Sequence, residues 1–249
     1  MTTESDLATT DAPALTAEFC EMLGLLGHDI SSPLTALKGR LQLMQRRAQR
    51  RAAEAAQAEA GDVERMLALV DRIGLQAATM LDASQIQTQT FSLDVAPTSL
   101  QPIITREIAR QYAMTPDATI LYEAAGVTIS GIWDKARVGR VVLALLGNAV
   151  RYGRGGRPII VRVRHLDAQV RVEVEDEGLG VPEAERAAIF QFGGRASNAR
   201  RHAGAGLGLF VAREVILLHG GDIGVETSAK GGSRFWFTLP LPVEDRADR

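Results

Sequence analysis

A histidine beside an aspartate, His28 and Asp29, is the first pair of residues in this sequence that could do chemistry. In the helix predicted for the surrounding segment, apolar residues form a stripe along one side. His28 falls on the side that points away from this stripe. Pro33 lies inside the same predicted helix, where a proline costs about 3 kcal/mol. An exposed imidazole beside a carboxylate can act as a nucleophile, because the carboxylate orients the ring. The alternative interpretation is a surface histidine of no consequence.

Two glycine-rich motifs form a second candidate site. Asp176-Glu177-Gly178-Leu179-Gly180 ends a predicted strand, and Gly204-Ala205-Gly206-Leu207-Gly208-Leu209 begins a predicted helix. Glycines at a helix N-terminus let backbone N–H groups approach a phosphate, and the Asp176 carboxylate can accept a hydrogen bond from an exocyclic amine such as that of adenine. Each motif alone is more often a turn. The usual P-loop and Rossmann phosphate motifs are excluded, because no lysine follows a GxxxxG run and no GxGxxG links a strand to a helix.

Asn148 adds an amide to this candidate site. It follows the apolar helix face that includes Leu145 and Leu146. An amide oxygen is a ligand suited to Mg2+ bridging nucleotide phosphates, and Arg151 lies on the same side of the helix. The other interpretation is a helix-end residue bonded to local backbone.

Residues 19–90 have the pattern of a helical hairpin. Only five of the 24 glycines precede residue 100, and apolar residues recur at helical spacing in two stripes, over 19–44 and 63–80. Gly61-Asp62 reads as the turn and N-cap between them. Two such narrow seams cannot be buried within one hairpin, so we predict a homodimer in which two hairpins form a four-helix bundle.

The rest of the chain alternates strands and helices, which predicts an α/β sandwich with helices on one face of a sheet. The expected strands are 91–95, 119–123, 127–132, 159–165, 169–175, 222–227 and 233–239, and the expected helices are 100–114, 135–152 and 207–219. Asp134 is placed to cap the second of these helices.

Composition excludes several classes of protein. The 46% hydrophobic content is that of a globular chain, and the net charge of −2 supplies no positive field for nucleic acid. The longest strongly apolar stretch, 141–146, is far short of the roughly 18 residues of a membrane span. A single cysteine and the lack of a leader pattern favour the cytoplasm.

The motifs in their order resemble those of bacterial two-component sensor histidine kinases. The matching boxes are His28-Asp29-Ile30-Ser31-Ser32-Pro33-Leu34, Gly147-Asn148-Ala149-Val150-Arg151-Tyr152, the two glycine motifs, and Gly231-Gly232-Ser233-Arg234-Phe235. The resemblance implies an α+β chain with a tail (1–15), a dimerisation and phosphotransfer hairpin (16–90), a Bergerat-type ATP-binding domain (91–241) and a second tail (242–249).

By this resemblance, His28 would receive the γ-phosphoryl of MgATP and pass it to an aspartate in the receiver domain of a response regulator. Asp29 would orient the imidazole and take its proton. Asn148 would hold Mg2+, and Asp176 would select adenine. The remaining implied nucleotide contacts are Arg151, Tyr152, Gly178, Gly180, Arg195, Gly204, Gly206, Leu207 and Gly208, with residues 183–203 as a mobile lid.

Several positions depart from the family pattern. Ala144 stands where a second asparagine is usual, Phe192 comes one place early in the lid motif, and Ser32 stands where threonine or asparagine usually supports dephosphorylation of the regulator. No sensor domain precedes His28 in this sequence, so we expect either that the chain is a piece of a longer kinase or that the signal comes from a separate sensor protein or from the N-terminal segment. The alternative functions are a non-catalytic phosphotransfer adaptor with a decayed ATP site, and an ATPase or serine kinase that shares only the ATP fold.

Overall fold

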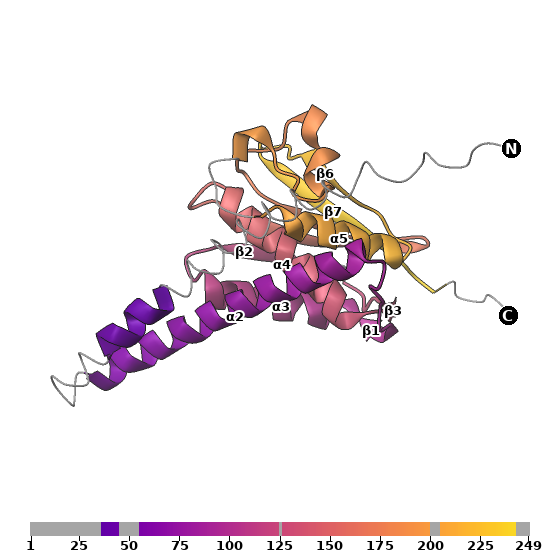
Figure 1. Ribbon diagram of the computed structural model, residues 1–249. Helices are drawn as coiled ribbons and strands as arrows, with labels where there is room; N and C mark the ends of the chain where they lie inside the picture. The colour runs from indigo at the N-terminus through magenta and orange to yellow at the C-terminus, as the bar shows by residue number, and fades with distance from the viewer. Residues whose placement is uncertain (1–35, 45–54, 125, 200–204, 243–249) are drawn as a thin grey trace, which may run out of the picture.

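The computed structural model describes residues 36–44, 55–124, 126–199 and 205–242. Residues 36–44 are helical, and helix α2 spans Ala55–Gln87 (Figure 1). The predicted turn at Gly61–Asp62 is wrong, because α2 runs through both residues. A glycine inside a helix costs about 1 kcal/mol relative to alanine, and the alanines and glutamates around Gly61 favour the helix enough to offset it. The hairpin and its bundle remain predictions, since most of the first stripe lies outside the described residues.

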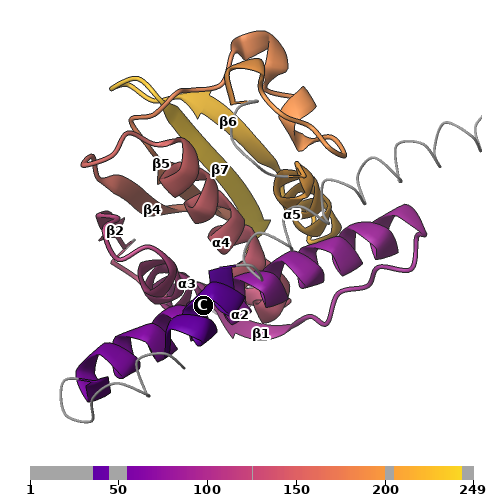
Figure 2. The same ribbon diagram turned by 60° about the vertical axis from the view of Figure 1, so that its left-hand side comes forward.

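The glycine-rich part is a sandwich of one sheet and three helices (Figures 1 and 2). The helices are α3 (Leu100–Met114), α4 (Lys135–Tyr152) and α5 (Leu207–Leu218). The sheet runs in the order β2 (Ile120–Glu123), β4 (Ile159–Leu166), β5 (Gln169–Glu175), β7 (Ser233–Pro240) and β6 (Ile223–Thr227). Only the β2–β4 pair is parallel among these. The helices cover one face of this sheet, as predicted, and α2 packs across the helical layer against α3 and α5 (Figure 2).

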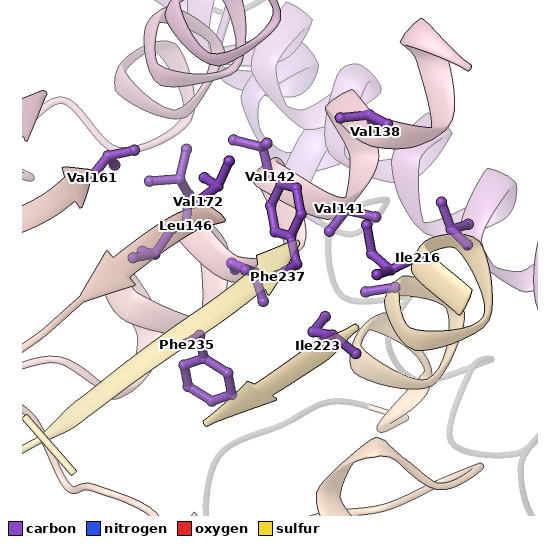
Figure 3. Packing of buried hydrophobic residues seen from close by; sticks show 14 of the residues in the cluster. Val138, Val141, Val142, Leu146, Val161, Val172, Ile216, Ile223, Phe235 and Phe237 are labelled. Atoms are coloured by element: carbon purple, nitrogen blue, oxygen red, sulfur yellow. The ribbon is translucent and has the colours of Figure 1, made fainter. Parts of the chain in front are cut away.

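The alternation of apolar and charged side chains along the strands explains why helices cover only one face of the sheet. In β5 the side chains of Val170, Val172 and Val174 are fully buried, while the intervening Arg171 and Glu173 form ion pairs. Successive strand residues point to opposite faces, so the valines meet the helices and the charges occupy the other face. Figure 3 shows Val142 of α4 close to the ring of Phe237 from β7 within this core.

Most predicted strands and helices agree with the structure to within one residue, but two strands do not. The expected strand 91–95 is wrong, because pairing begins at β1 (Ala96–Ser99). Its antiparallel partner β3 (Ser130–Trp133) starts three residues later than the predicted 127–132. Strand ends in this two-stranded sheet are decided by the partner, since Ala96 pairs with Trp133 and Ser99 with Ser130. Apolar alternation alone does not reveal that register.

Helix α4 begins at a well-satisfied cap. As predicted, the Asp134 side chain caps the helix, accepting hydrogen bonds from the backbone N–H groups of Ala136 and Arg137. The Asp134 N–H donates to Nε2 of His219, at the end of α5. The start of α4 and the end of α5 are therefore joined by a hydrogen bond. Within the described ranges, no helix combines the length and apolar character needed to cross a bilayer.

Candidate functional site

A cavity of about 270 Å³ lies among α4, α5, the segment after β5 and the C-terminal part of α2. It brings together residues that lie far apart in the sequence. Of the predicted site residues, the lining includes Asn148, Arg151, Tyr152, Gly180, Arg195, Gly206, Leu207 and Gly208. The sheet, the end of one helix and the start of another thus contribute to a single concave site, as binding pockets in mixed folds commonly do.

Asp176 and Gly178 are not among the residues that line this cavity. Gly178 packs against Tyr152, which does line it. The carboxyl group of Asp176 accepts a hydrogen bond of 2.8 Å from the Gly178 N–H and is almost fully buried. Burial raises the pKa of the Asp176 carboxyl, against the lowering effect of backbone hydrogen bonds from Gly178 and Ser233. Gly178 has no room for a side chain, because a Cβ would lie 2.0 Å from the carbonyl oxygen of Tyr152. The loop after β5 is therefore held tightly against the end of α4.

Gly206 and Gly208 form the start of α5 at the edge of the cavity. Gly206 is the N-cap, with a φ of 69° in the left-handed region. A Cβ on Gly206 would lie 2.7 Å from the carbonyl carbon of Gly193, so the helix start packs directly on the backbone of the preceding segment. The first N–H groups of a helix have no partner within the helix, and they favour an anion in front of them. The arrangement suits a phosphate.

Two phenylalanines anchor the segment 183–199 to the domain. The Phe190 ring packs edge to face on Phe235 of β7, and the Phe192 ring on Phe210 of α5, with centroids 6.4 and 5.3 Å apart. Both rings therefore have partners despite the early position of Phe192. Short 3-10 turns (Glu183–Glu185, Ala188–Phe190 and Ser197–Ala199) make up much of this segment.

Sequence reasoning missed the part of the cavity that α2 supplies. Leu75, Gln76 and Thr79 line it, beside Asp82. The Asp82 carboxylate is buried and pairs with Arg137 and Arg140 of α4. No local signal marks these positions, because their role depends on how α2 lies against the sandwich. Ser233 and Phe235 also line the cavity. The sequence signal that could have predicted them is the glycine-rich motif Gly231-Gly232-Ser233-Arg234-Phe235.

The donor set suits a magnesium nucleotide better than a metal cluster. Among the described residues, no three His, Cys, Asp or Glu side chains gather to hold a metal ion. The Asn148 amide is part of the cavity lining, near Arg151 and the start of α5. Mg2+ with nucleotides keeps most of its ligands as water and phosphate oxygens, so a single protein oxygen fits that mode of binding. His28, Asp29, Ser32 and Gly204 lie outside the described residues.

Comparison with known proteins shows what the sandwich domain is similar to. Residues 133–243 match the family described as histidine kinase-, DNA gyrase B-, and HSP90-like ATPase. The structure is also similar to that of the mycobacterial sensor histidine kinase MprB, with a TM-score of 0.54 and 26% identity, over 60% of this chain and 99% of that one.

Two curated relatives are similar to this chain over most of its length. The chain is 30% identical to the adaptive-response sensory kinase SasA of Synechococcus sp. (strain JA-3-3Ab), over 88% of this chain and 59% of the relative. It is 28% identical to the signal transduction histidine-protein kinase/phosphatase MprB of Mycobacterium leprae (strain TN), over 87% and 43%. The chain is thus similar to proteins named as sensory or signal-transducing histidine kinases, and it spans 43 to 59% of the length of these two relatives.

Proposed function

We propose that this protein is an ATP-dependent protein-histidine kinase of a two-component system. In the proposed reaction, His28 attacks the γ-phosphoryl group of ATP, ADP leaves, and the phosphoryl group then passes to an aspartate of a response regulator. The observation that carries the proposal is the convergence of Asn148, the loop after Asp176 and the Gly206–Gly208 helix start around one cavity of an ATPase-family domain.

Two groups of residues at the site suit the two parts of a nucleotide. The N-terminus of α5 offers unpaired N–H groups and a positive dipole end to the phosphates. The loop from Asp176 to Gly180 offers a buried carboxylate for the amine of adenine. Asn148 would hold Mg2+, which neutralises charge on the transferring phosphoryl group when it is bound. Arg151, Tyr152 and Arg195 line the same cavity and would contact the nucleotide.

The phosphotransfer helix has three proposed functional residues. His28 is the nucleophile, and Asp29 orients its ring and takes the proton that the imidazole loses. Ser32 is the hydroxyl that supports dephosphorylation of the regulator. These roles follow from the family pattern, because the three residues lie outside the described part of the chain.

We further propose that the chain is a cytoplasmic homodimer. Exposed apolar side chains follow one side of α2 at heptad-like spacing: Val63, Leu67, Val70 and Leu81. A second copy that presents the same stripe would bury them, as in a four-helix bundle. The partners would then be this second copy, the receiver domain of a response regulator and a separate sensor protein.

The direct test is incubation of the purified protein with radiolabelled ATP and Mg2+. We expect an acid-labile, base-stable phosphoryl group on the wild-type chain and its absence from His28→Ala. Label that persists in His28→Ala would overturn the assignment of the nucleophile. A titration with a non-hydrolysable ATP analogue separates the adaptor from the kinase, because an adaptor with a decayed site would bind none.

A further inference from the structure

Glu175 is a buried carboxylate whose partners come from three different strands or turns. One of its oxygens accepts a hydrogen bond from the Ser228 hydroxyl. The other is shared by Arg162 of β4 and by Arg234 of β7, whose Nη2 lies 3.2 Å away. Although burial raises the pKa of Glu175, the hydrogen bonds from Ser228 and Arg162 and the charge of Arg234 lower it overall. The carboxylate is therefore held in its ionised form.

Ser228 and Arg234 stand on either side of the turn between β6 and β7. Glu175 therefore joins both ends of this turn to the end of β5. Within the turn, the Lys230 N–H donates to the Ser228 hydroxyl and the Gly231 N–H to the Ser228 carbonyl oxygen. These hydrogen bonds hold the turn together, so its position depends on the positions of Ser228 and Arg234.

The β6–β7 turn is in direct contact with the loop that carries Asp176. A Cβ on Gly232 would lie 2.3 Å from the Asp176 carbonyl oxygen and 2.5 Å from the Gly178 nitrogen. The Asp176 N–H donates to the carbonyl oxygen of Ser233. Gly180 also faces this turn, since its Cβ would lie 3.3 Å from the Gly232 oxygen. A shift of the turn must move the backbone around Asp176.

We propose that Glu175 is a positioning residue for recognition of the nucleotide base: by holding Ser228 and Arg234 it fixes the β6–β7 turn, and the turn fixes the Asp176 carboxylate. The inference rests on the proposed function, in which Asp176 accepts a hydrogen bond from the amine of adenine. Glu175 itself lies on the opposite sheet face from the helices, among the arginines of that face, so it acts through Asp176.

Glu173 provides a matched control. It lies two residues earlier on the same strand and the same face, and it is as deeply buried as Glu175. Its ion-pair partners are Arg164 and Arg171, at 3.3 and 3.0 Å, and neither flanks the β6–β7 turn. Glu173→Gln therefore removes a buried charge from the same sheet face without removing a direct partner of Ser228 or Arg234.

The experiment compares the binding of ADP and of inosine diphosphate by calorimetric titration of the full chain. Inosine carries a carbonyl oxygen where adenine carries its amine, so the ratio of the two affinities reports the contact with Asp176. In Glu175→Gln the new amide places donors opposite the arginine donors. We expect ADP affinity to fall about tenfold, the equivalent of one hydrogen bond, with inosine diphosphate affinity nearly unchanged. Glu173→Gln should keep the wild-type ratio.

The outcomes separate this inference from the proposed function. A wild-type chain that binds neither nucleotide would overturn the proposed function. A wild-type chain that prefers ADP, together with a Glu175→Gln variant that keeps the same preference, would overturn the role of Glu175 alone. Equal losses in Glu175→Gln and Glu173→Gln would also overturn it, because they indicate a general weakening of the sheet. Ser228→Ala, which removes a single partner, should show the same change in ratio at smaller size if Glu175→Gln does not fold.

Discussion

At the scale of single residues, Gly206 and Gly208 require glycine for different reasons. Gly206 has a positive φ and packs on the backbone of Gly193. Gly208 has an ordinary helical conformation, and a Cβ there would meet only the Ala144 side chain, at 4.0 Å. The fold therefore demands glycine at 206, whereas at 208 among the described residues it leaves room for a side chain, and only the proposed nucleotide would exclude one.

We predict opposite effects for alanine at these two positions. Gly206→Ala should lower the free energy of unfolding by about 2 kcal/mol, because the left-handed conformation disfavours a Cβ and the Gly193 backbone cannot move aside. Gly208→Ala should not lower stability, because alanine is favoured over glycine inside a helix by up to about 1 kcal/mol. It should weaken ADP binding about tenfold or more, because the methyl group enters the cavity. Urea unfolding and calorimetric titration measure the two quantities. Tight ADP binding by Gly208→Ala would place the phosphates elsewhere.

Asp176 shows how a buried carboxylate can cost stability. A carboxyl group with a pKa raised in the folded state binds its proton more tightly when folded, so its contribution to stability is present at low pH and is lost as pH rises through the folded pKa. Burial raises the pKa of Asp176 in this way. At neutral pH the ionised carboxylate is therefore a net cost to folding.

Asp176→Asn should consequently stabilise the chain at neutral pH while weakening ADP binding, because the neutral amide avoids the burial of charge and still offers an oxygen to Gly178. We expect the gain in unfolding free energy to shrink as the pH falls and to vanish at about pH 3, where an ordinary aspartate carboxyl is largely protonated. Urea unfolding at both pH values checks this. Asp167→Asn, at an exposed position, should show no comparable gain. Destabilisation of Asp176→Asn at neutral pH would contradict the interpretation.

At the scale of elements, helix α2 is fixed to the sandwich by charge. Asp82 is buried between Arg137 and Arg140 of α4, and the Arg137 guanidinium also lies 4.4 Å above the Phe91 ring. Met80 and Ile86 add apolar contact with the domain core. The end of α2, the connecting segment and the start of α4 thus meet at the side of the cavity.

Asp82→Asn should loosen this junction. Removing one partner of a buried ion pair leaves uncompensated positive charge, which costs roughly 3 kcal/mol. We expect a lower free energy of unfolding and faster amide hydrogen exchange in the C-terminal half of α2, with exchange in β4 and β5 unchanged. Asp71→Asn, on the exposed side of the same helix, serves as the control. Unaltered exchange along α2 in Asp82→Asn would show that the ion pairs do not hold the helix in place.

At the scale of the whole molecule, the apolar stripe of α2 is the feature that the single chain leaves unburied. Leu67 has 59% of its surface exposed, and Leu81 has 58%. The stripe predicted from the sequence contained neither leucine. It ran through Val63, Met66, Val70, Ile73, Ala77 and Met80, of which the structure places Ile73 and Met80 half-buried. One helix thus presents one set of apolar residues to its own domain and a second set outward.

Leu67→Asp should convert a dimer into a monomer, because association would bury an unpaired carboxylate in the seam. Sedimentation velocity measures the change. Arg72→Asp, a charge change at an exposed position off the stripe, should leave the dimer intact. A Leu67→Asp chain that sediments like the wild type would exclude this stripe from the interface.

Much of the sandwich could be predicted from the sequence because its signals are local. The continuous apolar face of α4, the Asp134 cap and the alternation in β5 each act within a few residues, and all three agree with the structure. The Gly61 turn was wrong because glycine in a helix is a weak penalty that good helix formers on both sides outweigh. The 91–95 strand was wrong because a strand needs a partner, and here pairing begins at Ala96.

The sequence by itself determined the residue types of the candidate site: an amide, a carboxylate at a strand end and glycines at a helix start. Only the tertiary structure decided that Asn148, Gly180 and Gly206 line one cavity, that Asp176 lies outside its lining, and that α2 closes one side. It also joined Glu175 to Ser228, 53 residues away in the chain. The physical reason is that hydrogen bonds and ion pairs form between groups that strand order and helix packing bring together, and residue types along the chain do not encode those distances directly.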